Sequence, residues 1–206
     1  MILYLTNRNA KNKNAIPSIL RKVYKEKVYL FYDQPSLKLI KQKRINFIIC
    51  DRFSFLLKEK SINFVNKKVI NFHDSILPDI RGSYPIFWSI IFKKPIGFTV
   101  HYVNKKADKG DIIFQKKLLI KKKFKLSKIY DLLRLEKLNF IKKNWKKIIN
   151  NSLKKKKQNQ KIKHFFYKND FNKVKKLLET KKWNNTYEDI ILMRNKIIKK
   201  YKNENI

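Results

Sequence analysis

Three polar residues of this 206-residue chain have side chains that could act together as a catalytic centre. Asn71 and His73 stand two positions apart at the end of an extended run, so both side chains are expected on the same face of a strand. Asp108 lies in a polar loop between two later strands and could reach the same crevice. An amide, an imidazole and a carboxylate together supply an oxyanion stabiliser, a general acid or base, and an orienting anion.

Each of these residues also has a structural explanation when it is taken alone. A histidine near a strand end is more often a hydrogen-bonded structural group than a catalyst. Asn71 could cap a turn, and Asp108 before Lys109 and Gly110 is ordinary turn chemistry. The catalytic interpretation therefore depends on the three residues occurring together.

The elements that must position these residues are strands alternating with helices. β-Branched and aromatic enrichment predicts strands at residues 1–5, 28–32, 46–50 and 69–72, with helical segments around 15–24 and 36–42. Two further strands, 97–103 and 111–120, precede a long amphipathic helix that runs from near residue 127 to about 150. This order predicts an α/β fold, a Rossmann-like and mostly parallel sheet with flanking helices. Asn71 and His73 then lie at the carboxyl end of a strand, where such sheets bind ligands.

Beyond the long helix, the composition changes. Residues 153–163 are rich in lysine and glutamine with few core-forming residues, which predicts a linker. The remaining tail carries aromatic residues and two short helical patterns, and it is too short to form a stable domain alone. We therefore divide the chain into a catalytic domain, 1–152, and a basic linker with a small C-terminal appendage, 153–206. The aromatic tail is a candidate homodimer surface.

The formal net charge of +37 would attract polyanions at long range. Lysine, asparagine, isoleucine, phenylalanine and tyrosine are all abundant, however, and glycine is reduced to three residues. An A/T-rich coding sequence produces this joint bias, and the lysines are scattered through every segment. We favour compositional bias with a solvated surface, and a polyanion partner is the alternative.

Cysteine usage and hydropathy bear on the compartment. The single cysteine, Cys50, allows neither an intramolecular disulfide nor a cysteine-based zinc site, which suits a reducing cytoplasm. The apolar N-terminus lacks a basic leader and a cleavage site, so it is interpreted as a first strand. The longest mostly apolar run, 85–92, is far below the roughly 20 residues that span a bilayer. We expect a cytoplasmic protein with no membrane partner.

Several ordered motifs resemble the folate-dependent formyltransferase family. Residues 71–78 read Asn-Phe-His-Asp-Ser-Ile-Leu-Pro, and 81–85 read Arg-Gly-Ser-Tyr-Pro. Residues 97–102 read Gly-Phe-Thr-Val-His-Tyr, and 107–113 read Ala-Asp-Lys-Gly-Asp-Ile-Ile. The resemblance covers roughly residues 47–115, with the preceding strand–helix units agreeing in layout. It implies the formyltransferase fold and the family's activity, one-carbon transfer by an enzyme.

The resemblance also implies roles for particular residues. Asn71, His73 and Asp108 match the catalytic residues of the family, and 10-formyltetrahydrofolate is the implied co-substrate, with no metal. The implied folate contacts are Phe53, Phe55, Leu56, Leu57, Ala107 and Gly110. The implied substrate contacts are Arg81, Gly82, Ser83 and Pro85.

The segments at 81–89 and 164–170 are most similar to the nucleotide-sugar formyltransferases. This implies that the acceptor is the amino group of a nucleotide-linked aminodeoxysugar, whose pyrophosphate the positive charge would help to capture. The first alternative is a methionyl-tRNA formyltransferase lacking a full C-terminal tRNA-binding domain, and tRNA would then be the partner. A non-enzymatic polyanion-binding protein is a further alternative, although it leaves the three motif residues unexplained.

Two positions need separate interpretation. Asp74 stands where the family commonly has an uncharged residue, and we expect it either to raise the basicity of the neighbouring His73 or to select a cationic substrate group. His101 matches the family pattern in the middle of a strand, and we interpret it as structural.

Overall fold

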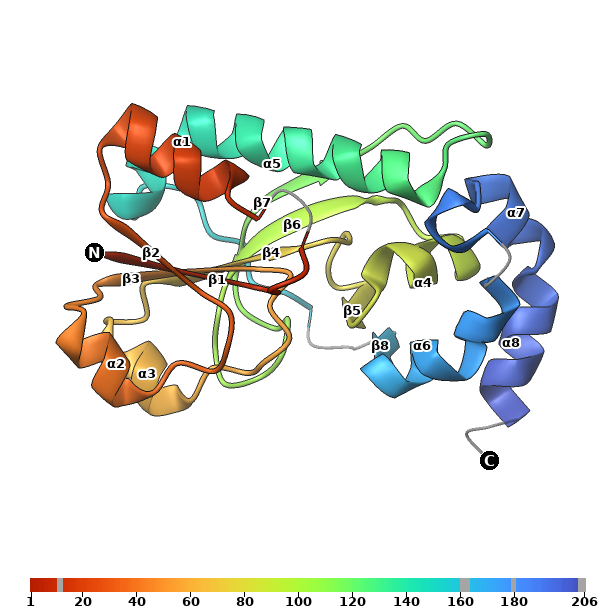
Figure 1. Cartoon of the computed structure of the whole chain (residues 1–206), viewed down its shortest axis with the longest axis horizontal. Coiled ribbons are helices and arrows are strands. Elements are labelled where there is room, and N and C mark those ends of the chain that lie inside the picture. The colour runs from red at the N-terminus through yellow and green to blue at the C-terminus, as the bar shows by residue number, and fades with distance from the viewer. Residues whose placement is uncertain (11–12, 160–163, 179–180, 204–206) are drawn as a thin grey trace.

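A computed structural model describes residues 1–10, 13–159, 164–178 and 181–203. A six-stranded sheet crosses the molecule with helices on both faces (Figure 1), in the order β2-β1-β3-β4-β6-β7. Its members are β1 (Ile2–Thr6), β2 (Val28–Phe31), β3 (Phe47–Asp51), β4 (Val69–His73), β6 (Gly97–Tyr102) and β7 (Ile112–Lys117). The first four strands are parallel, and β6 pairs antiparallel with both neighbours. The predicted α/β class, with a mostly parallel sheet, is confirmed.

Burial on both faces explains why these segments form strands. All five residues of both β1 and β3 are buried, as expected for central parallel strands covered on two sides. Helices α1 (Ala15–Tyr24) and α5 (Leu126–Ile149) pack on one face, while α2 (Leu37–Gln42) and α3 (Glu59–Phe64) pack on the other (Figure 1). The sheet is therefore the middle layer of a three-layer sandwich.

Alternation along β4 assigns its polar residues to different faces of this sandwich. Val69 packs in the layer under α2 and α3, whereas Phe72 packs in the layer under α1 and α5. Asn71 and His73 have the same parity as Val69, so they face the α2 and α3 side. Asp74 follows with the parity of Phe72 and faces α5.

The C-terminal segment packs against helix α4 (Pro85–Ile91) and the short strand before it. Strand β5 (Ile80–Gly82) pairs in parallel with β8 (His164–Phe166), and Trp88 stacks on Phe166 with ring centroids 4.1 Å apart. Phe171 of α6 (Lys168–Val174) joins the same core cluster as the strands. The remaining elements are α7 (Tyr187–Leu192), α8 (Arg194–Asn203), and 3₁₀ turns at Lys175–Leu178 and Lys182–Asn184.

Part of the predicted linker, residues 160–163, lies outside the described residues. The part before it is attached to the sheet, because the backbones of Ile112 and Lys156 exchange two hydrogen bonds of 2.8 Å. The division near residue 152 stays a prediction. Within the described ranges, no helix has the length and apolarity needed to cross a bilayer.

Candidate active site

The carboxyl end of β4 and the loop after β6 bring the three predicted catalytic residues together. Nδ1 of His73 lies 3.5 Å from Oδ1 of Asp108, and the side-chain nitrogen of Asn71 donates a 3.3 Å hydrogen bond to the same oxygen. One carboxylate oxygen is therefore shared by the amide and the imidazole. The structure places the three residues as the motif spacing predicts, and their catalytic role stays a prediction.

His73 is buried, and both of its ring nitrogens face acceptors. Nε2 lies 3.0 Å from the carbonyl oxygen of Ile80, while Nδ1 faces Asp108. The hydroxyl of Ser75 donates to the same carbonyl at 2.6 Å and fixes its position. A ring that carries protons on both nitrogens can donate to both acceptors at once. The surroundings thus hold the ring by one contact at each nitrogen.

Asp108 is held as an anion. Burial raises the pKa of its carboxyl, but the neighbouring His73 and His101 and the backbone amide of Gly82 lower it more. The net effect holds the pKa of Asp108 well below its usual range. Above that range the carboxylate is ionised, so it can orient an imidazolium and accept a proton.

Two glycines allow the loops around Asp108 to approach one another. Gly82 has a φ of 86°, and its amide donates a 2.9 Å hydrogen bond to Oδ2 of Asp108. A Cβ at Gly82 would collide with the backbone of Phe166, and one at Gly110 would collide with the carbonyl group of Tyr102. The absence of a side chain is thus a steric requirement at both positions.

His101 contacts the cluster, although its position suggested a structural role. Nδ1 lies 2.7 Å from the carbonyl oxygen of Tyr102, while Nε2 lies 3.1 Å from the side-chain nitrogen of Asn71 and 3.5 Å from Oδ1 of Asp108. Nε2 can accept from Asn71 when the ring is neutral or donate to Asp108 when it is protonated. Alternation along β6 was the available signal, because Thr99 and His101 are polar residues on one face of a buried strand.

Gln158 joins the site from a segment that sequence reasoning assigned to a linker. Its side chain is buried, and Oε1 accepts a 2.9 Å hydrogen bond from Nη2 of Arg81. Its amide nitrogen donates to the carbonyl oxygens of Asp108 at 3.0 Å and Gly110 at 2.7 Å. One side chain therefore ties together the Asp108 loop and β5. The lysine-rich surroundings gave no signal for this role.

The predicted substrate-binding residues lie beside the cluster, on β5 and at the start of α4. Arg81 is fully buried and is held by Gln158, so a direct contact with a substrate would require β5 to move. Gly82 supplies its amide to Asp108. Ser83 and Pro85 are half-buried.

Four of the six predicted folate contacts, residues 53 and 55–57, lie in an apolar loop after β3, and the other two lie in the loop that carries Asp108. Leu57 is buried in the core, while Phe55 and Leu56 are 46% and 63% exposed. The rings of Phe53 and Phe55 lie 5.4 Å apart. Ala107 is half-buried, and Gly110 is buried. The loop thus presents uncovered apolar surface.

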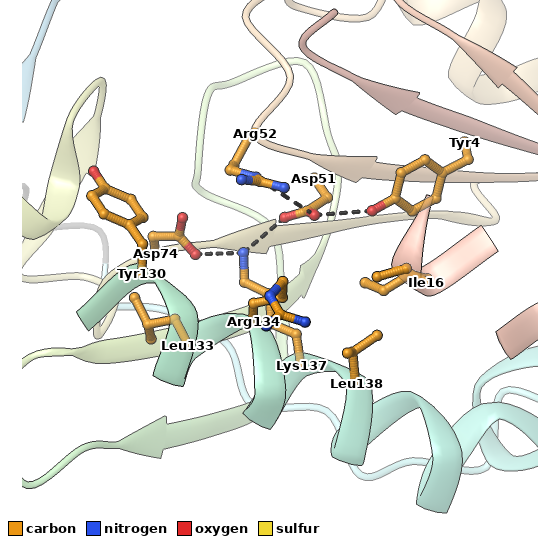
Figure 2. Close-up of a pocket in the computed structure, with 11 residues that line it drawn as sticks. Tyr4, Ile16, Asp51, Arg52, Asp74, Tyr130, Leu133, Arg134, Lys137 and Leu138 are labelled. Atoms are coloured by element: carbon orange, nitrogen blue, oxygen red, sulfur yellow. Dashed lines mark hydrogen bonds and ion pairs between the residues drawn. The ribbon is translucent and has the colours of Figure 1, made fainter. Parts of the chain in front are cut away.

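On the opposite face of the sheet, Lys137 of α5 bridges two aspartates (Figure 2). Its ammonium group lies 2.7 Å from Asp51 and 2.5 Å from Asp74, and the Tyr4 hydroxyl donates to Asp51 at 2.9 Å. Burial lowers the pKa of Lys137, but the two aspartates raise it more. Burial raises the pKa of Asp51, but Lys137 and Arg52 lower it more. The ion pairs fasten α5 to the ends of β3 and β4.

This bridge corrects the interpretation of Asp74. Its carboxylate points away from the face that carries His73 and is already neutralised by Lys137. Asp74 therefore neither faces the imidazole nor offers a free charge to a cationic substrate group. A small hollow of about 20 Å³, room for one water molecule, lies beside the bridge.

Among the residues that the structure describes, no group of three or more histidine, cysteine, aspartate or glutamate side chains is placed to hold a metal ion.

The mostly parallel sheet, with a polar cluster at the carboxyl end of a central strand, defines a Rossmann-like α/β protein, a class in which ligands commonly bind at that edge of the sheet. Residues 4–144 match the model of one family, described as formyl transferase. The chain therefore belongs to the formyl transferase family.

The similar proteins include methionyl-tRNA formyltransferases and sugar N-formyltransferases. A methionyl-tRNA formyltransferase of Staphylococcus epidermidis is 31% identical over 121 residues, which are 58% of this chain and 39% of that protein. The match thus spans well under half the length of this curated relative. The solved formyltransferase PseJ of Anoxybacillus kamchatkensis superimposes with a TM-score of 0.79 at 21% identity, covering 93% of this chain and 98% of that one. An N-formyltransferase of Helicobacter canadensis gives a TM-score of 0.67 at 20% identity, covering 97% and 81%.

Proposed function

We propose that the chain transfers a formyl group from 10-formyltetrahydrofolate to the amino group of a nucleotide-linked aminodeoxysugar. The observation that carries this proposal is the contact of Asn71 and His73 with one oxygen of Asp108, at 3.3 and 3.5 Å. PseJ, which was solved with UDP-4,6-dideoxy-4-formamido-L-AltNAc and tetrahydrofolate, resembles this chain over almost its whole length. The Helicobacter canadensis protein was solved with folinic acid and dTDP-3-aminofucose.

The proposed reaction is a direct transfer. An unprotonated amine attacks the formyl carbon and forms a tetrahedral oxyanion. His73 can donate a proton or a hydrogen bond to that oxygen only if Nε2 turns from the carbonyl oxygen of Ile80 toward it, because both ring nitrogens face acceptors here. Asn71 can assist only if one of its N–H groups turns from Asp108 or His101 toward that oxygen, because both partners occupy its nitrogen here. Asp108 orients His73 and accepts the amine proton, directly or through water. The bond between the formyl carbon and the folate nitrogen then breaks, that nitrogen takes up the proton that Asp108 received from the amine, and tetrahydrofolate leaves.

Formylation of methionyl-tRNA is the second candidate, and it is favoured by the 31% identity to the Staphylococcus epidermidis protein. The sugar acceptor is preferred because the likeness to PseJ includes most of the C-terminal segment that packs on α4. The high positive charge favours neither acceptor, since nucleotide sugars and tRNA are both anionic.

The test gives the purified chain 10-formyltetrahydrofolate together with either nucleotide-linked 3-amino and 4-amino sugars or charged initiator tRNA. Mass spectrometry follows the formylated product, and Asp108→Asn is the matched inactive control. We expect a formylated sugar and unmodified tRNA. Turnover of tRNA alone would select the second candidate, and turnover of neither would contradict the proposed function.

The proposal extends to the setting of the enzyme. A reducing cytoplasm suits the free, buried Cys50.

We also propose a homodimer that uses the C-terminal segment, where Tyr167 and Leu192 are 68% and 80% exposed. Light scattering of the purified chain would report its mass, and a monomer at micromolar concentration would contradict the dimer.

A further inference from the structure

Tyr84 has a backbone conformation that is unusual for its residue type and for its place in the chain. Its φ of 52° and ψ of 44° are left-handed, a region that a bulky side chain rarely adopts. Tyr84 is also the residue from which α4 begins, where an extended conformation is usual. The next residue, Pro85, favours an extended conformation before it as well. Three separate preferences are thus overruled at this one residue.

Most of the other left-handed residues are explained by their position. Among the described residues other than glycine, six with a positive φ lie within three positions of the end of a helix, namely Lys25, Arg44, Asn66, Lys67, Lys93 and Asn151. A left-handed residue is an ordinary way to end a helix. The other three are Arg52, Tyr84 and Asp108. Asp108 belongs to the polar cluster of the candidate active site, and strained backbone concentrates where a site is held in one shape.

A stacked ring from the C-terminal segment holds Tyr84. Phe171 of α6 lies face to face with it, with ring centroids 3.9 Å apart and an interplanar angle of 17°. Phe171 is buried, and its ring also meets that of Phe87 edge to face at 5.1 Å, so it is fixed from a second side. Aromatic pairs contribute favourable free energy beyond the burial of their area, which can offset an unfavourable backbone conformation. Phe171 is therefore the contact that can keep Tyr84 left-handed.

The two residues before Tyr84 connect this stack to Asp108. The Ser83 amide donates a 2.8 Å hydrogen bond to the carbonyl oxygen of Phe166, and the Gly82 amide donates one of 2.9 Å to Oδ2 of Asp108. Gly82 thus faces the carboxylate, while Ser83 and Tyr84 are held by the C-terminal segment. An extended Tyr84 would change the direction of the chain at this point and move the Gly82 amide away from the carboxylate.

Resting on the proposed function, we infer that Phe171 is a positioning residue for Asp108. By stacking on Tyr84, it stabilises the left-handed turn that brings the Gly82 amide to the carboxylate. The carboxylate then keeps its orientation toward His73. Phe171 touches none of the reacting atoms, so it acts on the rate through this turn alone. The C-terminal segment is in this way coupled to the reaction.

Two variants and a suppressor separate this role from a loss of stability. Phe171→Leu keeps a buried apolar side chain and removes the flat ring. Phe47→Leu is the control, because Phe47 is buried to a similar degree at the amino end of β3. We expect Phe171→Leu to lower kcat by about 10- to 100-fold, the scale on which small misplacements of a catalytic group act, with KM for the folate unchanged. Phe47→Leu should lower the urea midpoint and leave kcat unchanged.

The suppressor is Tyr84→Gly, added to Phe171→Leu. It should restore kcat to within a few-fold of the unmodified chain, because glycine adopts the left-handed conformation without a stacking partner. The urea midpoint should stay low in this double variant, since the stack remains absent. Recovery of the rate without recovery of the stability is the result that a merely structural role of Phe171 does not produce.

A second readout does not depend on turnover. Gly82 is the one glycine of the chain that follows an arginine, so isotopic labelling of arginine carbonyl carbons and glycine nitrogens selects its amide in an NMR spectrum. The selection also works in Tyr84→Gly, where the introduced glycine follows a serine. Hydrogen exchange at the Gly82 amide should be slow in the unmodified chain and in Phe47→Leu. It should be about tenfold faster in Phe171→Leu and slow again in the double variant.

Unchanged exchange at Gly82 in Phe171→Leu would overturn the inference, as would a loss of kcat that Tyr84→Gly does not repair. Equal losses of kcat in Phe171→Leu and Phe47→Leu would also overturn it, because stability would then explain the effect. If the unmodified chain formylates no amino sugar, the proposed function fails. The exchange rates at Gly82 then decide by themselves whether Phe171 holds the turn at Asp108.

Discussion

Oδ1 of Asp108 lies 3.5 Å from Nδ1 of His73, and this contact joins the loop after β6 to the end of β4. The other carboxylate oxygen accepts the Gly82 amide at 2.9 Å, so the carboxylate is fixed from two sides. An imidazole between a carboxylate and a backbone carbonyl has a defined orientation before any substrate binds. The cluster is thus preorganised by the fold.

Asp108→Asn should reduce kcat by about 100- to 10,000-fold, the usual contribution of positioned acid–base groups. The amide keeps the shape of the side chain but removes the charge that orients His73 and the base that accepts the proton. Steady-state kinetics with the sugar acceptor checks the size of the loss, and circular dichroism checks that the fold is retained. Activity within a few-fold of the unmodified chain would contradict the assigned role.

Gln158→Ala should lower kcat and the free energy of unfolding together. The change leaves Arg81 and two loop carbonyls without their buried partner, which costs about 1–3 kcal/mol. Kinetics and urea denaturation measure the two effects, and Lys157→Ala is the control because the neighbouring side chain is exposed. If Gln158→Ala kept both the activity and the stability of the unmodified chain, the hydrogen bonds of Gln158 would contribute to neither.

Residue pattern predicted the strands and the cluster but not the contacts between distant segments. Buried β-branched runs and period-two alternation placed Asn71 and His73 correctly, because these signals are local. Lys137 was not recognised, since one buried lysine among 52 lysines and arginines looks like its solvated neighbours. Gln158 and the pairing of β8 with β5 depend on tertiary register, which local composition does not encode.

Lys137→Met should destabilise the fold by about 3–5 kcal/mol, because two buried carboxylates lose their common partner. Urea denaturation at pH 7 gives the free energy of unfolding. Lys143→Met, an exposed position on the same helix, is the control and should change it little. Equal stability of the two variants would mean that the bridge is not a structural support.

The pKa shifts predict how stability depends on pH. The pKa values of Asp51 and Asp108 are lowered in the folded state, so their contribution is present above the ordinary value of about 3.9. It is lost as the pH falls through the folded values. The pKa of Lys137 is raised, so its contribution is present below about 10.4 and is lost as the pH rises through the folded value.

Urea midpoints measured from pH 3 to 7 should therefore rise with pH in the unmodified chain. In Lys137→Met, burial without the ammonium group should raise the pKa of Asp51. Asp51 then works against the increase of stability with pH, so the variant should lose less stability on acidification than the unmodified chain. Parallel pH profiles would contradict the proposed coupling of Asp51 to Lys137.

Asp74→Asn tests the assignment of Asp74 to the opposite face of the sheet. The alkaline limb of the pH–rate profile is the range in which the rate falls as the pH rises. If the charge of Asp74 acted on His73, removing that charge would move this limb to lower pH. The structure instead pairs Asp74 with Lys137, so we expect the limb to stay in place while the free energy of unfolding falls. Profiles of kcat/KM for both chains with the same acceptor make the comparison, because this parameter reports groups of the free enzyme. Asp108→Asn should distort the same limb, provided that residual activity allows measurement. A clear shift of this limb in Asp74→Asn would show that the charge of Asp74 acts on the catalytic cluster after all.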